Sequence, residues 1–408
     1  MKRFWLGSAA PVGVALAALG GFAAPAAADG IELGLRGYMN TFFSVAGIDN
    51  GGGNADALAL IGPDPREFNS TGLYSDGEIH FRGSYIADNG IAFGVRVELE
   101  ASSEVNNDDS GAGDEIDERY IFVEGSFGRI EAGSTNTAAY QMHVAAPFVG
   151  VPVNSGWFTA FIPDTAGMYS GFNTPEYGTY LDYGNDENSL TYYTPRIWGF
   201  QLGLSYTPSV VDNGDGKNFP VEADKTEEFY NGLSVGLNYV EDWNGLGVMA
   251  SAGYRRATTP DDLADFLDSI GIDAGNVEMV SAGLQLSYAG FALGGSYANQ
   301  LSGPNFGVIT TEGQSWDVGL SYTYGPWQVG ATWMQSRIEG FYDNPILSAI
   351  EGVDTSGDSR VRVGSLGVSY DIGPGIQLSG TLMWARYDTE FGYEVEGVAG
   401  IVGTSLRF

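Results

Sequence analysis

The sequence predicts an all-β fold, namely a sixteen-stranded antiparallel transmembrane β-barrel with one long loop folded inward. Three observations lead to this fold class. Apolar and polar residues alternate along many short segments, which is the pattern of strands with one apolar face. Short turns alternate with long polar connections along the chain, as they do in barrels that cross an outer membrane. Glycine accounts for 61 of the 408 residues, about twice its usual share.

The start of the chain, residues 1–28, has the pattern of a secretory signal peptide. A basic beginning precedes an apolar stretch, and Ala26-Ala27-Ala28 forms a small-residue cleavage site before Asp29. Pro11 interrupts the apolar stretch, which is also too short for a membrane helix. We therefore expect a mature chain of residues 29–408 that forms a single barrel domain in the cell outer membrane.

Cleavage is expected between Ala28 and Asp29, because the small-residue rule is met there and the polar mature chain begins at Asp29. Mass spectrometry of the protein from outer-membrane fractions should give a mass that begins at Asp29. A retained N-terminal segment would contradict this prediction.

The composition excludes several classes of protein. The formal net charge is −33, with 51 acidic and 18 basic residues, so the basic footprint of a nucleic-acid-binding protein is missing. Aromatic residues make up 13% of the chain, and this content with the strong periodicity argues against disorder. An exported chain without cysteine has no disulfide framework, so backbone pairing and burial must stabilise it.

The first predicted strands, at 31–40, 78–85 and 91–101, each separate an apolar face from a polar face. In a membrane barrel the apolar face contacts lipid and the polar face lines the lumen. The polar faces therefore place Arg36 and neighbouring charged residues in the lumen. The fourth strand, near 119–124, has an unclear face, because Tyr120 and Phe122 alternate with the equally apolar Ile121 and Val123.

The stretch 134–187 differs from the segments on either side of it. It holds neither the strand nor the helix period, and it contains four prolines and ten aromatic residues. A connection of this length without regular elements is uncommon and usually functional. Because so many aromatic side chains would not remain in water, we expect the loop to fold into the barrel and pack against its inner wall.

The second half of the chain repeats one unit, an alternating strand, a short turn and another alternating strand. Clear examples are Gly283 to Tyr297, Asp317 to Trp333 and Leu366 to Trp384. Tyrosine and tryptophan fall at the strand ends, where an aromatic girdle is expected. Between the units lie long polar connections, one of which, 260–270, reads as a short capped helix. Five strands are expected before the long loop and eleven after it.

Acidic, glycine-punctuated runs in the connections suggest two alternatives, calcium binding or solvated loops. Oxygen-rich runs suit calcium, but the full EF-hand spacing is absent from each of them. No cofactor is otherwise required. The candidate calcium ligands in the run 106–118 are Asp108, Asp109, Asp114 and Asp117.

Two stretches that flank the long loop resemble those of a Gram-negative general porin of the alphaproteobacterial type. Before the loop stands Phe127-Gly128-Arg129-Ile130-Glu131-Ala132-Gly133. After it come Asn188-Ser189-Leu190-Thr191-Tyr192-Tyr193-Thr194-Pro195 and Gly199-Phe200, and the last residue is Phe408. The resemblance implies a homotrimer of sixteen-stranded barrels, embedded in outer-membrane lipid and lipopolysaccharide. It also implies that the barrel-assembly machinery reads Phe408.

The resemblance further implies a pore constriction, in which acids of the inward-folded loop 134–187 face basic residues of the wall. The matching basic residues are Arg36, Arg82 and Arg96, joined by Arg129. The candidate loop acids are Asp164, Glu176, Asp182, Asp186 and Glu187. The plainer alternative is that the arginines are solvated lumen residues that pair with Glu78 and Glu98. The loop departs from the enterobacterial pattern, since Pro175-Glu176-Tyr177-Gly178 is its nearest match to PEFGG.

Two channel functions are open on this sequence. The first is passive diffusion of small hydrophilic solutes and ions, weakly selective for cations because acidic loops surround the mouth. The second is a substrate-specific channel in which loop aromatics form a binding track for sugars or carboxylates. A barrel that only anchors or adheres is a third class. An enzyme is not expected, because neither His80 nor His143 stands in a nucleophile motif.

Overall fold

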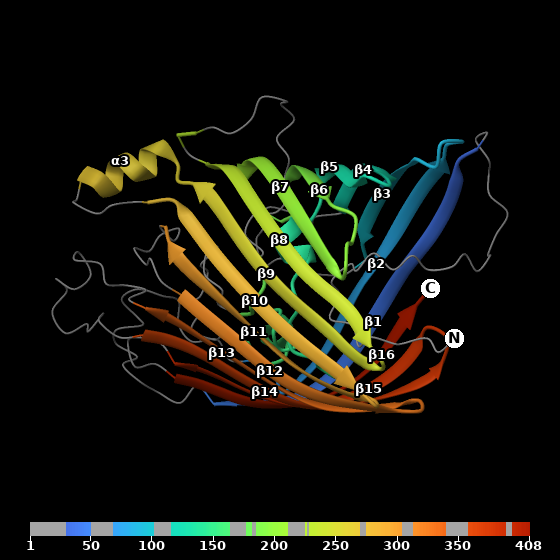
Figure 1. The fold of residues 1–408 in the computed structure, drawn as a ribbon. Coiled ribbons are helices and arrows are strands. Elements are labelled where there is room, and N and C mark those ends of the chain that lie inside the picture. The colour runs from blue at the N-terminus through green and yellow to red at the C-terminus, as the bar shows by residue number, and fades with distance from the viewer. Residues whose placement is uncertain are drawn as a thin grey trace.

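The computed structural model describes residues 30–49, 68–101, 116–163, 177–181, 185–210, 225–226, 228–269, 275–303, 313–339, 358–388 and 394–408. Sixteen strands form a closed antiparallel barrel in which each strand pairs with its neighbours in sequence and β1 pairs with β16 (Figure 1). The prediction of a sixteen-stranded barrel, with five strands before the long loop and eleven after it, is confirmed.

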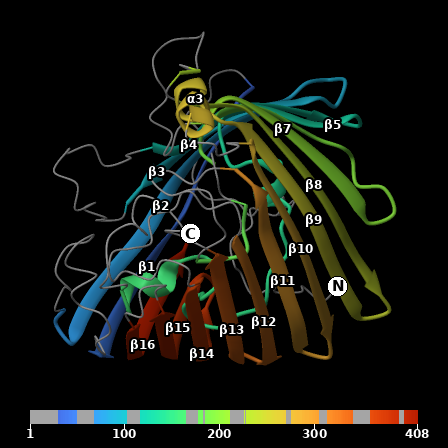
Figure 2. The same ribbon diagram turned by 90° about the vertical axis from the view of Figure 1, so that its left-hand side faces the viewer.

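The strands differ in length around the ring. Five strands precede the long loop: β1 (Glu32–Asp49), β2 (Thr71–Ile86), β3 (Ala92–Glu100), β4 (Ile116–Gly125) and β5 (Gly128–Ser134). Eleven follow it: β6 (Asn188–Tyr193), β7 (Phe200–Val210), β8 (Phe229–Trp243), β9 (Leu246–Thr258), β10 (Val277–Tyr288), β11 (Phe291–Ser302), β12 (Gly313–Tyr324), β13 (Trp327–Glu339), β14 (Asp358–Gly373), β15 (Ile376–Asp388) and β16 (Glu394–Arg407). Figure 2 shows β10 to β16 side by side in sequence order.

Alternation along each strand gives the barrel an apolar outer surface. Leu33, Phe81 and Leu366 are among the many large apolar side chains that are about half exposed on this surface. The fourth strand, whose face the sequence left open, is resolved by burial. Tyr120 and Phe122 are buried inside, while the side chain of Ile121 is 60% exposed on the outside.

Helices are few in the described part of the chain. α2 (Ala138–Gln141) and the 3-10 helix η1 (Trp157–Ala160) lie in the long loop. α3 (Asp261–Ser269), which confirms the predicted short helix, projects beyond the strands between β9 and β10 (Figure 1). No helix among the described residues is both long and apolar enough to span a membrane.

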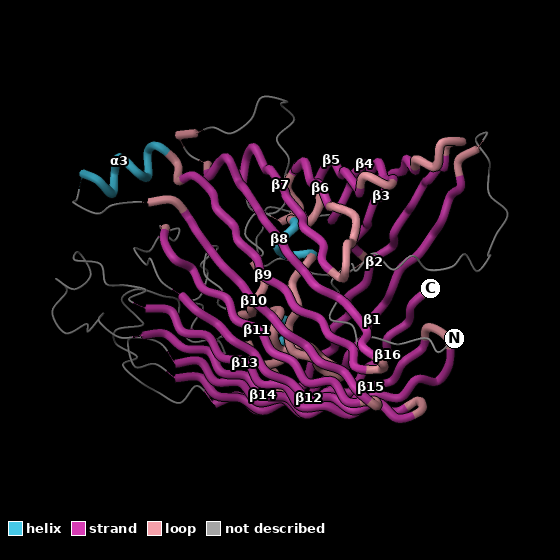
Figure 3. The backbone as a smooth tube through the Cα atoms, viewed as in Figure 1, coloured by secondary structure: helices cyan, strands magenta, loops and turns pink. Residues whose placement is uncertain are grey.

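The described part of the long loop, residues 135–163, 177–181 and 185–187, lies inside the barrel and packs against the inner wall (Figure 3). Val151, Phe158 and Ile162 of the loop are fully buried in a cluster with inward residues of β13 to β16 and with Phe42 of β1. α2 contacts β6 to β9. The predicted packing of this loop on the inner wall is therefore confirmed, whereas its role in narrowing a pore stays a prediction.

Candidate functional site

Backbone N–H groups of the loop are held by hydroxyl groups that point inward from successive strands. The N–H of Ala138 donates to Ser205 Oγ on β7 at 2.9 Å, and the N–H of Ala139 donates to Ser234 Oγ on β8 at 2.9 Å. The N–H of Val144 donates to Ser251 Oγ on β9, also at 2.9 Å. Because a buried N–H without a partner costs about 1–3 kcal/mol, these serines fix the path of the loop.

Loop carbonyl groups lie on wall glycines of alternate strands. Four such contacts follow one another along the loop, from Ala138 on Gly236, Val144 on Gly283 and Pro147 on Gly319 to Val149 on Gly367. A Cβ atom at any of these glycines would overlap the carbonyl oxygen above it. Glycine at these positions lets the loop backbone lie directly on the wall.

Asp317 on β12 is the centre of the polar contact between loop and wall. Its carboxylate accepts hydrogen bonds from the N–H of Ala146 at 3.0 Å, from Asn154 Nδ2 at 3.2 Å and from Thr179 Oγ1 at 3.0 Å. The Ser296 hydroxyl donates to the same carboxylate at 2.7 Å. One buried carboxylate thereby joins the first half of the loop, at Ala146 and Asn154, to Thr179 near its end, and four donors reduce the cost of its desolvation.

His143 is part of the same buried contact. Its Nε2 lies 3.1 Å from Thr179 Oγ1, and its ring meets the Tyr180 ring edge-on at 4.7 Å between centroids. Burial lowers the pKa of His143 to about 3, so the imidazole is neutral at neutral pH. Burial also raises the pKa of Tyr180, with a further contribution from the charge of Asp317. This histidine therefore packs the loop in place and is not a free acid or base.

The four predicted basic residues lie close together on the inner wall formed by β1 to β5. Arg36, Arg96 and Arg129 all interact electrostatically with Arg82. In register, Arg82 stands opposite Arg96 and beside Gly34 of β1. Phe122 of β4 lies beneath two of them, with its ring centroid 3.8 Å from the Arg129 guanidinium carbon and 5.4 Å from that of Arg82. The barrel register thus assembles these residues from four strands.

Two of the four arginines are paired with carboxylates. Arg96 forms an ion pair with Glu98. Arg129 binds Glu131 at 2.6 Å and Glu124 at 2.9 Å. Arg36 and Arg82 have no ion pair with any carboxylate in the described part of the chain. The alternative in which these arginines pair with Glu78 and Glu98 therefore describes only Arg96.

A second charged group on the same wall surrounds His80. The imidazole Nδ1 lies 3.0 Å from Arg96 Nη2, which can only donate, so the ring proton sits on Nε2. That Nε2 group donates to Glu78 Oε2 at 2.5 Å. Tyr38 donates to the other oxygen of Glu78 at 2.8 Å. The aromatic and imidazole groups thereby orient Glu78 within the lumen wall.

The candidate loop acids divide into two groups. Asp164, Glu176 and Asp182 lie outside the described residues. Asp186 and Glu187 lie at the end of the loop where it joins β6, and the Asp186 carbonyl accepts a hydrogen bond from Ser134 Oγ. Their position at a constriction stays a prediction.

Of the calcium candidates, Asp108, Asp109 and Asp114 lie outside the described residues. Asp117 lies beside Glu78 and Glu100, with one oxygen of each within 4.8 Å of the others. The structure thus places Asp117 in the acidic part of the wall, and calcium binding by this aspartate stays a prediction.

Sequence reasoning missed the residues that hold the loop. Ser205, Ser234 and Gly283 fall on the polar faces of ordinary strands, and their residue types are common throughout the chain. The feature that could indicate such a support is a series of small or hydroxyl residues at inward positions of successive strands. These residues leave room for the backbone of the loop to lie on the wall. That signal becomes readable only when the strand register is known.

Comparison with known proteins agrees with this architecture. A family model described as Gram-negative porin matches residues 15–390. An uncharacterised protein of Rickettsia felis is 25% identical over 372 residues, covering 78% of this chain and 81% of that protein. Another of Rickettsia typhi is 24% identical over 353 residues, covering 71% and 76%.

Two solved structures show the same fold at low sequence identity. The anion-selective porin from Comamonas acidovorans has a TM-score of 0.55 at 16% identity, covering 93% of this chain and 100% of that one. OmpT, an outer membrane protein of Vibrio cholerae in its trimer form, has a TM-score of 0.54 at 12% identity with the same coverage. Because the family model spans most of a chain that closes into this sixteen-strand barrel, the protein belongs to the Gram-negative porin family.

Proposed function

We propose that this porin is a passive diffusion channel for small hydrophilic solutes and ions, with a weak preference for cations. The family and the barrel point to an outer-membrane channel rather than an enzyme. The proposal therefore concerns what passes through the channel and what narrows it. In this proposal the loop 134–187 narrows the lumen, with Arg36, Arg82, Arg96 and Arg129 on the wall that faces the remaining opening.

The charge of that wall supports the cation preference. Carboxylates on the inner faces of β2 to β5 outnumber the four arginines of β1, β2, β3 and β5, so the formal charge of this wall is negative. Eight acidic residues belong to it: Asp76, Glu78, Glu98, Glu100, Asp117, Glu118, Glu124 and Glu131. A negative wall raises the local concentration of cations. The porin from Comamonas acidovorans has the same fold and is anion-selective, so the architecture alone does not set the sign of the selectivity.

The test is the reversal potential of the purified protein in planar bilayers under a potassium chloride gradient. We expect discrete ion-conducting steps and a cation-directed reversal potential that is larger at low salt, because the screening length is about 30 Å at 0.01 M and about 8 Å at 0.15 M. Anion selectivity at low salt would refute the proposed selectivity. A barrel that conducts no ions would refute the channel itself.

A substrate-specific channel is the second candidate, and an aromatic group inside the barrel favours it. Trp157 of the loop and Tyr74 of β2 lie edge to face with ring centroids 6.0 Å apart, and both are only partly buried. Tyr177 lies near them, against Phe158 at 5.8 Å. Partly exposed rings in a lumen suit stacking on a sugar. Saturable sugar flux that Trp157→Ala abolishes would favour this candidate over simple diffusion.

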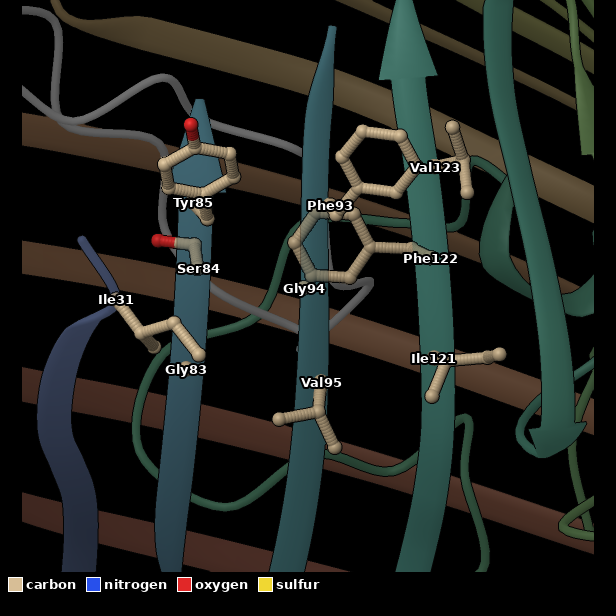
Figure 4. A pocket seen from close by; sticks show the side chains of 10 residues that line it. All are labelled: Ile31, Gly83, Ser84, Tyr85, Phe93, Gly94, Val95, Ile121, Phe122 and Val123. Carbon is tan, nitrogen blue, oxygen red and sulfur yellow. The ribbon is translucent and has the colours of Figure 1, made fainter. Parts of the chain in front are cut away.

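The proposed trimer is supported by the short strands on one side of the barrel. A membrane strand needs about 9–11 residues to cross the hydrocarbon core, but β5 has 7 residues and β6 has 6. Next to them, the outer face of β2 to β4 forms an apolar groove of about 300 Å³ (Figure 4). Its outer wall includes Phe93, Val95 and Ile121. Neighbouring copies of this chain would cover this face, because strands this short do not span the hydrocarbon core in contact with lipid.

A lysine in this groove is expected to break the trimer. Ile121→Lys should convert a trimer that resists detergent and mild heating into monomers, because it buries a charge between copies. Leu366→Lys on β14 is the matched control, since both wild-type side chains are 60% exposed in the single chain. Native electrophoresis and light scattering would measure the change. Equal behaviour of the two variants, or a monomeric wild type, would count against the trimer.

The remaining partners rest on the family resemblance. Phe408 exchanges backbone hydrogen bonds of 3.0 Å with Gly37, and its side chain is 63% exposed. This exposed terminal ring supports the proposal that the barrel-assembly machinery reads it. Outer-membrane lipid and lipopolysaccharide are proposed to surround the barrel.

A further inference from the structure

The charged residues on the inner wall of β1 to β5 are sorted by sign along the strands. The arginines lie near the strand ends that short turns connect. Arg82 stands four residues before the end of β2 and, in register, opposite Arg96, which stands four residues after the start of β3. Arg129 is the second residue of β5, and Arg36 of β1 interacts electrostatically with Arg82. These four arginines therefore occupy one half of the wall, which we call the basic half.

Most carboxylates of this wall lie toward the opposite ends of the same strands. Glu100 is the last residue of β3, and Asp117 is the second residue of β4. Glu78 stands opposite Glu100 in register, and one oxygen of each of Glu78, Glu100 and Asp117 lies within 4.8 Å of the others. We call this part of the wall the acidic half. Its members are Asp76, Glu78, Glu98, Glu100, Asp117 and Glu118.

The two halves have formal charges of opposite sign. The basic half contains the four arginines and two carboxylates, Glu124 and Glu131, which bind Arg129. The acidic half contains six carboxylates, and its described inner face holds no lysine or arginine. The ion pair between Arg96 and Glu98 joins the two halves and marks their boundary. Because two of the four arginines have no ion pair with a described carboxylate, the basic half keeps a positive charge of its own.

The distance between the halves is long enough for ions to sense them separately. Arg82 and Glu78 are four residues apart on β2, as are Arg96 and Glu100 on β3. Four residues span about 13 Å along a strand. The screening length is about 10 Å at 0.1 M salt. At this salt concentration an ion within one half is therefore governed mainly by the charge of that half.

The first part of the long loop adds no charge that would cancel this difference. Residues 135–163 contain no aspartate, glutamate, lysine or arginine. Their one histidine, His143, is buried and neutral, because burial lowers its pKa to about 3. The wall of β1 to β5 therefore supplies the charge that ions meet beside this part of the loop.

The acidic half lies at the cell-exterior end of the barrel. The connections that leave it, 50–70 and 101–115, are longer than the turns at the other ends of these strands, 87–91 and 126–127. In outer-membrane barrels the longer connections are extracellular. The basic half therefore lies toward the periplasm.

We propose that this axial division of charge makes the open channel rectify ionic current. The effect requires the diffusion channel proposed above. Cations accumulate in the acidic half and anions in the basic half. When the exterior is positive, cations move inward and anions move outward, so both reach the boundary and raise the ion concentration there. The opposite voltage draws both ions away from the boundary, and each can be replaced only through a half that repels it. The current should therefore be larger when the exterior is positive.

The test compares currents at equal voltages of both signs. The full mature protein is placed in planar phosphatidylcholine bilayers with equal potassium chloride on both sides. The chain contains no cysteine, so Ser269→Cys at the exposed end of α3 introduces a single thiol on the exterior side. A membrane-impermeant thiol reagent, applied to vesicles before they fuse with the bilayer, measures the orientation of the channel.

The salt dependence of the current separates wall charge from pore shape. At 0.1 M potassium chloride we expect a current at least about twofold larger when the exterior is positive, and nearly equal currents at 1 M, where the screening length is about 3 Å. Equal currents at 0.1 M, or a larger current when the exterior is negative, would overturn the proposal. Rectification that persists unchanged at 1 M would also overturn it, because it would not depend on wall charge.

One variant tests each half of the wall. Arg82→Gln and Glu100→Gln should both reduce the rectification, while they shift the reversal potential in a salt gradient in opposite directions. A uniformly negative pore of asymmetric shape predicts a different result, because removal of Arg82 would then increase the rectification. An increase in Arg82→Gln would therefore overturn the division into two halves.

Arg360→Gln is the matched control for the loss of a positive charge. Arg360 lies on the outer face of β14, because its neighbour Val361 is buried against the loop. This variant should leave the rectification unchanged. A reduction as large as that of Arg82→Gln would count against the proposal.

Heat-dependent migration in electrophoresis establishes that each variant is folded before it is recorded. If a variant does not fold, the voltage and salt dependence of the wild-type current still decides the question. A wild type that shows conducting steps with equal currents would refute the rectification and leave the diffusion channel intact. A wild type that conducts no ions would refute both.

Discussion

Open-channel conductance and heat stability are both expected to fall when Gly283 and Gly367 are replaced by alanine. Each new methyl group would overlap a loop carbonyl oxygen, that of Val144 or that of Val149. The loop must then move off the wall, and the only free direction is toward the axis of the barrel. Overpacking of this kind costs about 1–3 kcal/mol per site.

Gly34→Ala is the matched control for the glycine variants. Gly34 also faces the lumen from a strand, but a Cβ atom there would meet only the Arg82 carbonyl oxygen at 4.0 Å. Alanine generally suits a strand better than glycine in conformational entropy, so the control should be at least as stable as wild type. Single-channel recording and heat-dependent migration in electrophoresis would measure the two effects. Equal conductance and stability of Gly283→Ala, Gly367→Ala and Gly34→Ala would show that the position of the loop does not depend on its contacts with Gly283 and Gly367.

The second large effect is expected at Arg82. Replacing it by glutamine should increase the cation preference, because this guanidinium has no ion pair among the described carboxylates. At about 8 Å in water a unit charge is worth about 0.5 kcal/mol, with opposite sign for cations and anions. The cation-to-anion permeability ratio should therefore rise about fivefold at low salt and about twofold at 0.15 M.

Arg129→Gln is the comparison that separates charge from pairing. Removing Arg129 leaves Glu131, which is 3% exposed, without its cation. A buried carboxylate in that position is expected to take up a proton, which cancels most of the charge change. The reversal potential should therefore shift more for Arg82→Gln than for Arg129→Gln. A larger shift for Arg129→Gln would contradict the view that Arg82 is the unpaired charge that acts on ions. If the reversal potential shifts in neither variant, both arginines are solvated lumen residues without a role in selectivity.

The pairing of Arg96 shows how far the constriction could be predicted from sequence. Alternation on β3 places Arg96 and Glu98 on the same inward face, so both the lumen position and a nearby acid could be predicted. Whether Arg82 shares that acid depends on how two strands align, and the register places Arg82 opposite Arg96. The sequence therefore predicted the cluster, whereas only the structure separated its paired from its unpaired members.

Local periodicity alone determined the number of strands, the lumen faces of β1 to β3 and the length of the inward loop. These features depend on residues that are neighbours in sequence, because side chains alternate every second residue along a strand. β4 was the exception, since both of its faces are apolar. The contact of Phe122 with Arg82 and Arg129 settled its orientation.

The path of the long loop was decided only in three dimensions. The loop has no period of its own, and its direction comes from residues such as Ser205, Gly283 and Asp317, which lie on separate strands. Each of these residues is ordinary where it stands in the sequence. They form one continuous support only when the barrel closes and brings successive inward faces side by side, and the energy that holds the loop arises from those long-range contacts.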